Sequence, residues 1–65
     1  MNKEIGYAIR NRRKDLRITQ KELAEKIDCN YATVCSMEKG ERVTSIYIFR
    51  ALDVLGLKLE IKIKD

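Results

Sequence analysis

The fold is decided by residues 19–40, which read TQKELAEKIDCNYATVCSMEKG. This stretch contains two helix starts that are separated by a short turn. Thr19 and Glu22 have the T-x-x-E spacing of a capping box, in which the hydroxyl and the carboxylate each accept a free backbone N–H of the first turn. The first helix is therefore predicted to begin at Thr19 and to end near Lys26.

The second helix start follows the turn. Asp28 is a residue type that tolerates turn backbone, and Asn30 is a favoured N-cap. The end of this helix is predicted at Lys39 and Gly40, because a cation in the last turn followed by a glycine is typical of helix C-termini. Two short helices that share one apolar face across a tight turn are typical of a helix-turn-helix.

This stretch resembles the helix-turn-helix of the phage repressor/Cro family, also called the XRE family. The shared pattern is T-Q-x-E-L-A, a turn, a helix with a buried β-branched residue, and then E-x-G. The residues that carry it here are Thr19, Gln20, Glu22, Leu23, Ala24, Val34, Glu38 and Gly40. The resemblance extends over roughly residues 5–56. It implies an all-α, four- to five-helix, lambda-repressor-like DNA-binding domain.

The resemblance also implies roles for individual side chains. The recognition helix would span residues 30–39 and lie in the major groove, with Tyr31, Ala32 and Ser36 reading base edges. The expected phosphate contacts are Gln20, Asn30, Thr33, Lys39 and Arg42. For Gln20, a purely structural role at the helix start is the alternative. No base-reading residue can form the bidentate pair that arginine makes with guanine, so specificity would be modest or depend on DNA shape.

A helix is predicted before the motif, from about Lys3 to Asp15. Its apolar stripe consists of Ile5, Ile9 and Leu16. Arg13 falls on the same stripe, and a buried arginine needs a partner because an unpaired buried charge is costly. The available carboxylate is Glu38, and the resembling family pairs the matching residues. We therefore expect a structural Arg13–Glu38 ion pair between this helix and the recognition helix.

Positive charge is concentrated near the N-terminus. The net charge is +4, which favours an anionic partner. The cations of the first 17 residues are Lys3, Arg10, Arg12, Arg13, Lys14 and Arg17. A solvated helix face is the alternative, but beside a helix-turn-helix a phosphate-facing surface is favoured. Arg17 stands where the family often has glycine, so it is expected either in a strained turn or facing DNA.

A last helix is predicted after the motif, capped by Thr44 or Ser45 and ending at Leu55 and Gly56. Its core stripe is expected to be Ile48, Leu52 and Leu55. The remaining positions are also apolar, namely Tyr47, Phe49, Ala51 and Val54. A helix that is apolar on more than one face needs a cover, and a second subunit is the natural candidate.

The tail alternates between apolar and charged residues, which is the period of a half-buried β-strand. Its apolar positions are Leu57, Leu59, Ile61 and Ile63. Because a lone strand leaves its backbone groups unpaired, we expect it to pair across a two-fold homodimer; a frayed tail is the alternative. The predicted division is a repressor-like domain over 1–56 and a dimerisation strand over 57–65. This architecture also resembles that of HipB-type antitoxins.

Several classes of protein are disfavoured. With two cysteines and no histidine, the chain offers too few ligands for a zinc site, and we expect neither a metal nor a cofactor. Cys29 is expected to be packed and Cys35 exposed, both as reduced thiols in a cytoplasmic protein. No apolar run is long enough to span a membrane. An enzyme is not expected, since there is no histidine and no glycine-rich phosphate loop.

The sequence therefore predicts a dimeric transcriptional regulator, most simply a repressor, that binds a palindromic operator in double-stranded DNA. The alternative is an antitoxin that binds a toxin protein and uses DNA binding to regulate its own operon.

Overall fold

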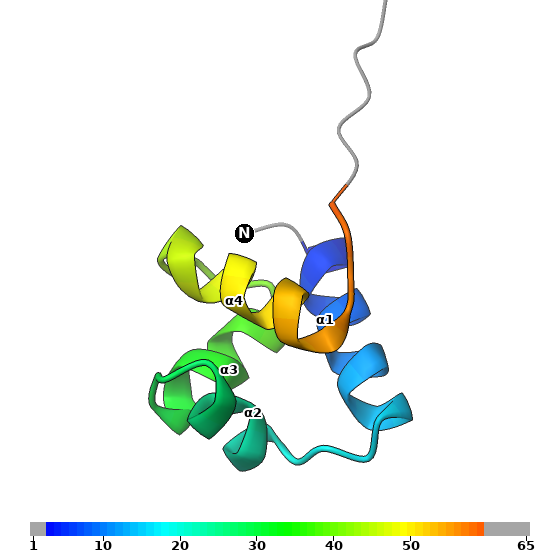
Figure 1. Cartoon of the computed structure of the whole chain (residues 1–65). Helices are drawn as coiled ribbons and strands as arrows, with labels where there is room; N and C mark the ends of the chain where they lie inside the picture. Colours follow the sequence, from blue (N-terminus) through cyan, green and yellow to red (C-terminus); the bar gives the residue numbers. More distant parts are fainter. Residues whose placement is uncertain (1–2, 60–65) are drawn as a thin grey trace, which may run out of the picture.

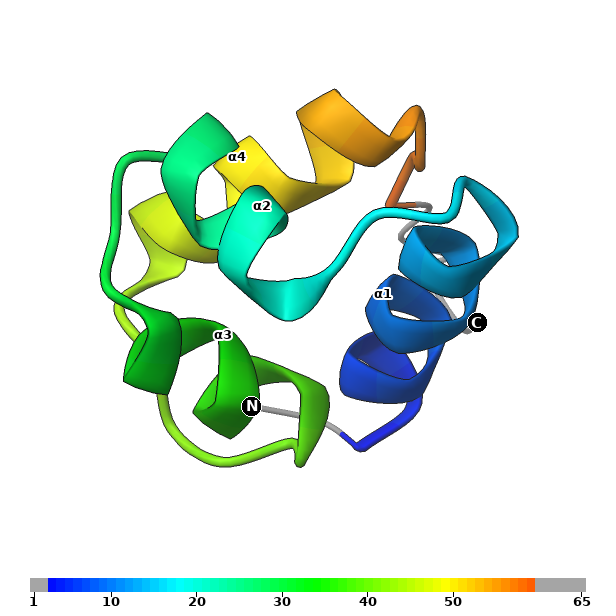
Figure 2. The ribbon, with the colours of Figure 1, turned by 90° about the horizontal axis from the view of Figure 1, so that it is seen from below.

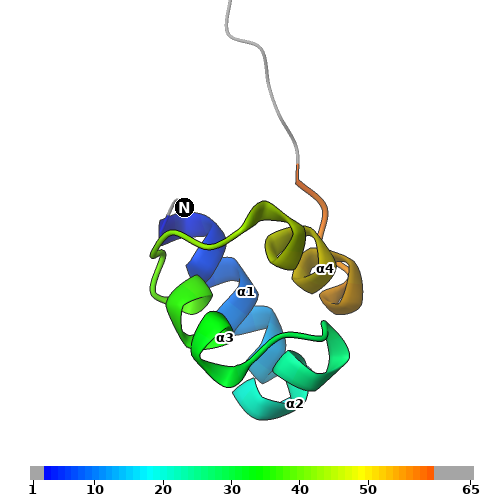
Figure 3. The same cartoon turned by 90° about the vertical axis from the view of Figure 1, so that its left-hand side faces the viewer.

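A computed structural model describes residues 3–59 of the 65-residue chain. Four helices follow one another in this range, as Figure 1 shows: α1 (Lys3–Asp15), α2 (Gln20–Lys26), α3 (Tyr31–Glu38) and α4 (Ser45–Leu55). α3 packs against α1 and α2, and α1 also packs against α4. In Figure 2 α4 lies at the top of the view and α3 at the bottom, and in Figure 3 α4 lies above α2. An all-α domain with a helix-turn-helix is thus confirmed.

All four helices contribute to one hydrophobic core. Its buried residues are Ile9, Leu23, Ala24, Ile27, Val34, Met37, Ala51, Leu52 and Leu55. Two predictions about the core are wrong. Ala51 is fully buried, because it lies on the side of α4 that enters the shared core, while Ile48 is only partly buried against that core. Leu16 is 41% exposed, because α1 ends at Asp15 and Leu16 lies in the turn that follows.

The predicted caps of the helix-turn-helix are confirmed. The Glu22 N–H donates to Thr19 Oγ1 at 3.0 Å, and the Thr19 N–H donates to Glu22 Oε1 at 2.9 Å, which completes the capping box. Asn30 Oδ1 accepts the Thr33 N–H at 3.1 Å at the start of α3. At α4 the N-cap position belongs to Thr44, but its side chain makes no capping hydrogen bond. The fourth helix therefore lacks the side-chain cap that the sequence predicts.

Each helix ends with the same backbone motif. Just after the last turn of each helix, one residue has a left-handed backbone conformation; these residues are Arg17, Asp28, Gly40 and Gly56. The next residue donates its N–H to a carbonyl five positions earlier, as in a Schellman motif; these bonds are Ile18 to Arg13, Cys29 to Ala24, Glu41 to Ser36 and Leu57 to Leu52. Three of these donors, Ile18, Cys29 and Leu57, pack against the core. Of the two alternatives for Arg17, the structure therefore shows the strained turn.

Substitution of Arg17 by glycine is expected to stabilise the domain. Arg17 has φ 58°, a conformation that costs a residue with a Cβ about 1–2 kcal/mol, partly offset by the entropy of glycine. We expect the free energy of unfolding in urea to rise by about 0.5–1 kcal/mol. Gly56→Ala is the matched control, since a Cβ there would meet nothing within 4 Å and only the backbone strain is added. A lower stability for Arg17→Gly would contradict this explanation.

The tail leaves α4 without forming a strand in its described part. Residues 57–59 are irregular, with Leu57 partly buried and Leu59 48% exposed. Ile61 and Ile63 lie outside the described residues, so the strand and its pairing across a dimer stay predictions. Between residues 3 and 59, no helix has the length and hydropathy needed to cross a bilayer.

Candidate nucleic-acid interface

One side of α3 is buried and the other faces solvent. Val34, Met37 and Glu38 are buried against the other helices. Tyr31 and Ala32 are exposed, and Ser36 is half-buried on the outer side. The structure thus brings the three residues expected to read bases to the solvent side of the recognition helix.

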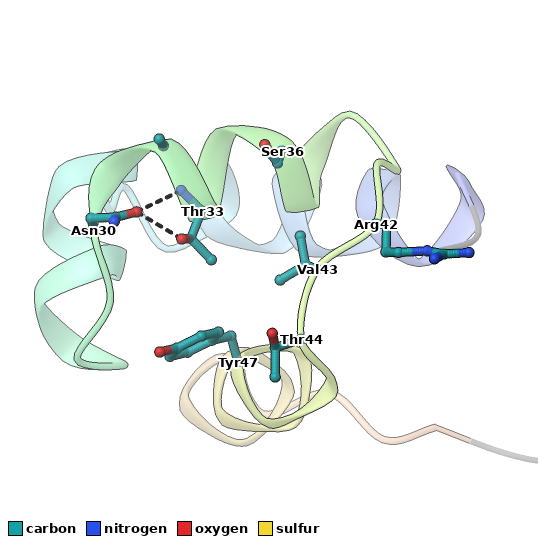
Figure 4. A pocket seen from close by; sticks show the side chains of 8 residues that line it. Asn30, Thr33, Ser36, Arg42, Val43, Thr44 and Tyr47 are labelled. Atoms are coloured by element: carbon teal, nitrogen blue, oxygen red, sulfur yellow. Dashed lines mark hydrogen bonds between the residues drawn. The ribbon is translucent and has the colours of Figure 1, made fainter.

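A groove separates α3 from the chain that follows it. This groove, which we call the α3–α4 groove, is lined by Asn30, Ala32, Thr33, Ser36, Arg42, Val43, Thr44 and Tyr47. Figure 4 shows Asn30, Thr33 and Ser36 along one wall, with Thr44 and Tyr47 opposite and Arg42 reaching away from the groove. Thr33 Oγ1 donates to Asn30 Oδ1 at 2.7 Å, so both side chains take part in the cap of α3.

A second hollow lies on the opposite flank of α3. It is bordered by Arg10, Gln20, Cys35, Glu38 and Lys39, and we call it the α1–α3 hollow. Lys39 and Arg10 are exposed at this hollow, whereas Glu38 is buried. The solvent side of α3 is therefore a ridge with a concave surface on either side.

The expected ion pair ties α1 to the end of α3. Arg13 Nε lies 2.6 Å from Glu38 Oε2, and Arg13 Nη2 donates to Glu38 Oε1 at 3.1 Å. The third nitrogen, Nη1, donates to the Ile18 carbonyl at 2.8 Å. Both residues are less than a tenth exposed. This bidentate geometry satisfies two charges that would otherwise be buried without a partner.

Gln20 extends this network to the surface of α3. Its Nε2 donates to Glu38 Oε1 at 3.1 Å, while its Oε1 accepts from the Tyr31 hydroxyl at 3.2 Å and from the Cys35 thiol at 3.7 Å. An amide nitrogen has two N–H donors, so the Glu38 bond uses only one of them. The sequence predicts Gln20 as a phosphate contact, with a role at the helix start as the alternative; its bonds to α3 add a positioning role.

The Tyr31 hydroxyl is held as a hydrogen-bond donor. The Cys35 side chain, through hydrogen bonding and charge, raises the pKa of Tyr31 above its ordinary value. A phenol is already protonated at neutral pH at its ordinary pKa, and this shift acts in the same direction. It can both donate to a neighbour and accept from one.

Two of the basic residues near the N-terminus are bound to protein acceptors. Arg13 is paired with Glu38, and Arg12 Nε donates to the Leu55 carbonyl at the end of α4 at 2.9 Å. Arg50 Nη1 similarly donates to the Ile27 carbonyl at the end of α2 at 3.2 Å. Nothing in the local sequence signals the Arg12 bond, since Arg12 and Leu55 are 43 positions apart. The basic surface is thus smaller than the sequence suggests.

Both cysteines are free thiols and both are partly buried. Cys29 packs against the core as expected, and burial raises the pKa of its thiol. The prediction that Cys35 is exposed is wrong, because the thiol turns toward Gln20. Over residues 3–59, no three histidine, cysteine or acidic side chains are grouped closely enough to hold a metal ion.

The fold and the solvent-facing recognition helix define a helix-turn-helix DNA-binding protein. Residues 9–62 match the helix-turn-helix family of the XRE type. Because this match covers most of the sequence, the chain belongs to that family. A comparison with curated proteins gave no match. Membership makes this chain a DNA-binding transcriptional regulator.

Proposed function

We propose that the protein is a repressor that occupies operator DNA in the cytoplasm, with α3 in the major groove. The observation that supports this most directly is the solvent side of α3, where Tyr31, Ala32 and Ser36 lie on a ridge between two concave surfaces. An α-helix that stands out from its domain in this way fits the major groove of B-form DNA. Repression would follow from occupation of DNA that polymerase needs.

The side chains of the ridge match chemical groups on base edges. The Tyr31 hydroxyl can donate or accept a hydrogen bond, the Ala32 methyl can contact a thymine methyl, and Ser36 can bond to several bases. Lys39 and Arg42 are exposed cations beside the ridge and are proposed to contact phosphates. Asn30 and Thr33 are proposed to contribute phosphate contacts from the α3–α4 groove, and Gln20 through its second amide N–H.

Dimerisation is proposed because α4 presents apolar side chains to solvent. Ile46 is 48% exposed, Phe49 56% and Val54 38%. A second copy of the chain would cover them, together with the tail residues Leu57 and Leu59. Two recognition helices about 34 Å apart would then meet successive major grooves of a palindromic operator.

The proposal is tested with fluorescently labelled DNA from upstream of the gene, titrated with protein alongside scrambled DNA. We expect selective binding that weakens with salt, with two chains bound per operator. Tyr31→Ala/Ser36→Ala is expected to lower operator affinity about tenfold or more, since each base contact contributes about 1–3 kcal/mol of discrimination. Tyr7→Ala is the control, because Tyr7 is exposed on α1 and borders neither concave surface. Equal binding to both DNAs would contradict the repressor proposal.

An antitoxin that binds a toxin protein is a second candidate. The exposed apolar side chains of α4 favour it, since they could serve a protein partner as well as a second copy. Co-expression with the neighbouring gene distinguishes the two. Co-purification of its product, lost on Phe49→Ser but kept in Tyr31→Ala, would favour the antitoxin.

A further inference from the structure

We infer that the α1–α3 hollow holds a phosphate of the DNA backbone, and that Arg10 on α1 is the residue that contacts it. This inference rests on the proposed docking of α3 in the major groove. Arg10 is not part of the helix-turn-helix. Its role follows from where α1 crosses α3.

The two concave surfaces lie on opposite flanks of the same ridge. Ala32 and Ser36 border the α3–α4 groove, whereas Cys35 and Lys39 border the α1–α3 hollow. The major groove is about 12 Å wide and has a phosphate backbone along each edge. A helix that enters it therefore has one backbone on either side. If one backbone follows the α3–α4 groove, the other runs past the α1–α3 hollow.

The charges of the hollow suit a phosphate. Arg10 and Lys39 bring two exposed cations to its border. Its carboxylate, Glu38, is already neutralised by Arg13 at 2.6 Å. The remaining charge of the hollow is therefore positive, and the second Nε2 proton of Gln20 adds a neutral donor.

Arg10 differs from the other two arginines of α1 in what its guanidinium does. Arg12 is bonded to the Leu55 carbonyl and Arg13 to Glu38. Within residues 3–59, no hydrogen bond or ion pair joins Arg10 to a protein acceptor. Its planar fork of N–H donors is thus available, and this geometry matches the oxygens of a phosphate.

The test measures operator affinity of the full chain by fluorescence anisotropy over a series of salt concentrations. Each phosphate contact contributes about 0.9 to the slope of log affinity against log salt. For Arg10→Ala we expect this slope to become shallower by about 0.9 per subunit, with about an eightfold loss per subunit at 0.1 M salt, as the same relation gives. The loss should be similar for operator and scrambled DNA, because phosphate contacts carry no sequence information. Arg10→Lys should keep most of the slope.

Lys26→Ala is the matched control. It also removes one exposed cation, but Lys26 lies in the last turn of α2 and borders neither concave surface. Its slope should stay at the wild-type value, and melting midpoints should show that both alanine variants remain folded. If the wild type binds its operator and Arg10→Ala has the same slope as Lys26→Ala, the inference is overturned and the proposed function stands. If the wild type shows no selective binding, the proposed function itself fails, and the inference with it.

Discussion

Glu38→Ala is expected to lower the free energy of unfolding by about 3–5 kcal/mol, because it leaves the buried Arg13 guanidinium without its carboxylate. Three hydrogen bonds are lost with Glu38, two from Arg13 and one from Gln20. A domain of this size is stable by only about 3–10 kcal/mol. The variant should therefore be partly or wholly unfolded at 37 °C.

Urea denaturation of three variants separates the charge from the packing. Glu38→Gln keeps the shape of the side chain and some hydrogen bonds, so its free energy of unfolding should fall by less than that of Glu38→Ala. Arg13→Met/Glu38→Met removes both charges and should be more stable than Glu38→Ala, since two apolar side chains can replace a buried pair at little cost. An unchanged unfolding midpoint for Glu38→Ala would refute the structural role of the pair.

Gly6→Ala is expected to destabilise the domain by about 3 kcal/mol, in the upper range for overpacked sites. A Cβ at Gly6 would lie 2.5 Å from the Met37 carbonyl oxygen and 2.9 Å from that of Glu38. These atoms belong to the backbone and cannot rotate away. α1 and α3 would have to separate where Gly6 lies against the backbone at the end of α3.

Helix propensity acts in the opposite direction and needs its own control. Alanine is favoured over glycine in a helix by about 1 kcal/mol. Ala8→Gly, at an exposed position of α1, measures this difference without any steric effect. Thermal melting should place Gly6→Ala well below Ala8→Gly. A Gly6→Ala protein more stable than the wild type would mean that the close approach of α1 and α3 is wrong.

The sequence was most informative where structure depends on neighbouring residues. Thr19 with Glu22, and Asn30 with the N–H three positions later, predict two helix starts because their partners lie within one turn. Gly40 and Gly56 mark helix ends for the same reason. Arg13 could also be matched to Glu38, because a charge on an apolar stripe demands a partner and the resemblance names one.

Features that depend on contacts between distant segments were missed. The role of Arg12 as a donor to α4, and the burial of Ala51, follow from how α4 crosses α1. The need for glycine at position 6 follows from the distance between α1 and α3. In the candidate site, the sequence offered Gln20 a phosphate contact or a role at the helix start, but not its bonds to Tyr31 and Glu38, which become apparent only once α2 and α3 are placed.

The shared ending of the four helices also determines where the chain can change in length. After α1, α2 and α4, the residue that follows the left-handed position is an apolar anchor in the core, so an inserted residue would pull Ile18, Cys29 or Leu57 out of place. After α3, the equivalent residue is Glu41, which is exposed. The fold should therefore tolerate inserted residues, including an epitope tag, best between Glu41 and Arg42. That position borders the proposed DNA surface, so a change in length there would alter DNA recognition before it altered the fold.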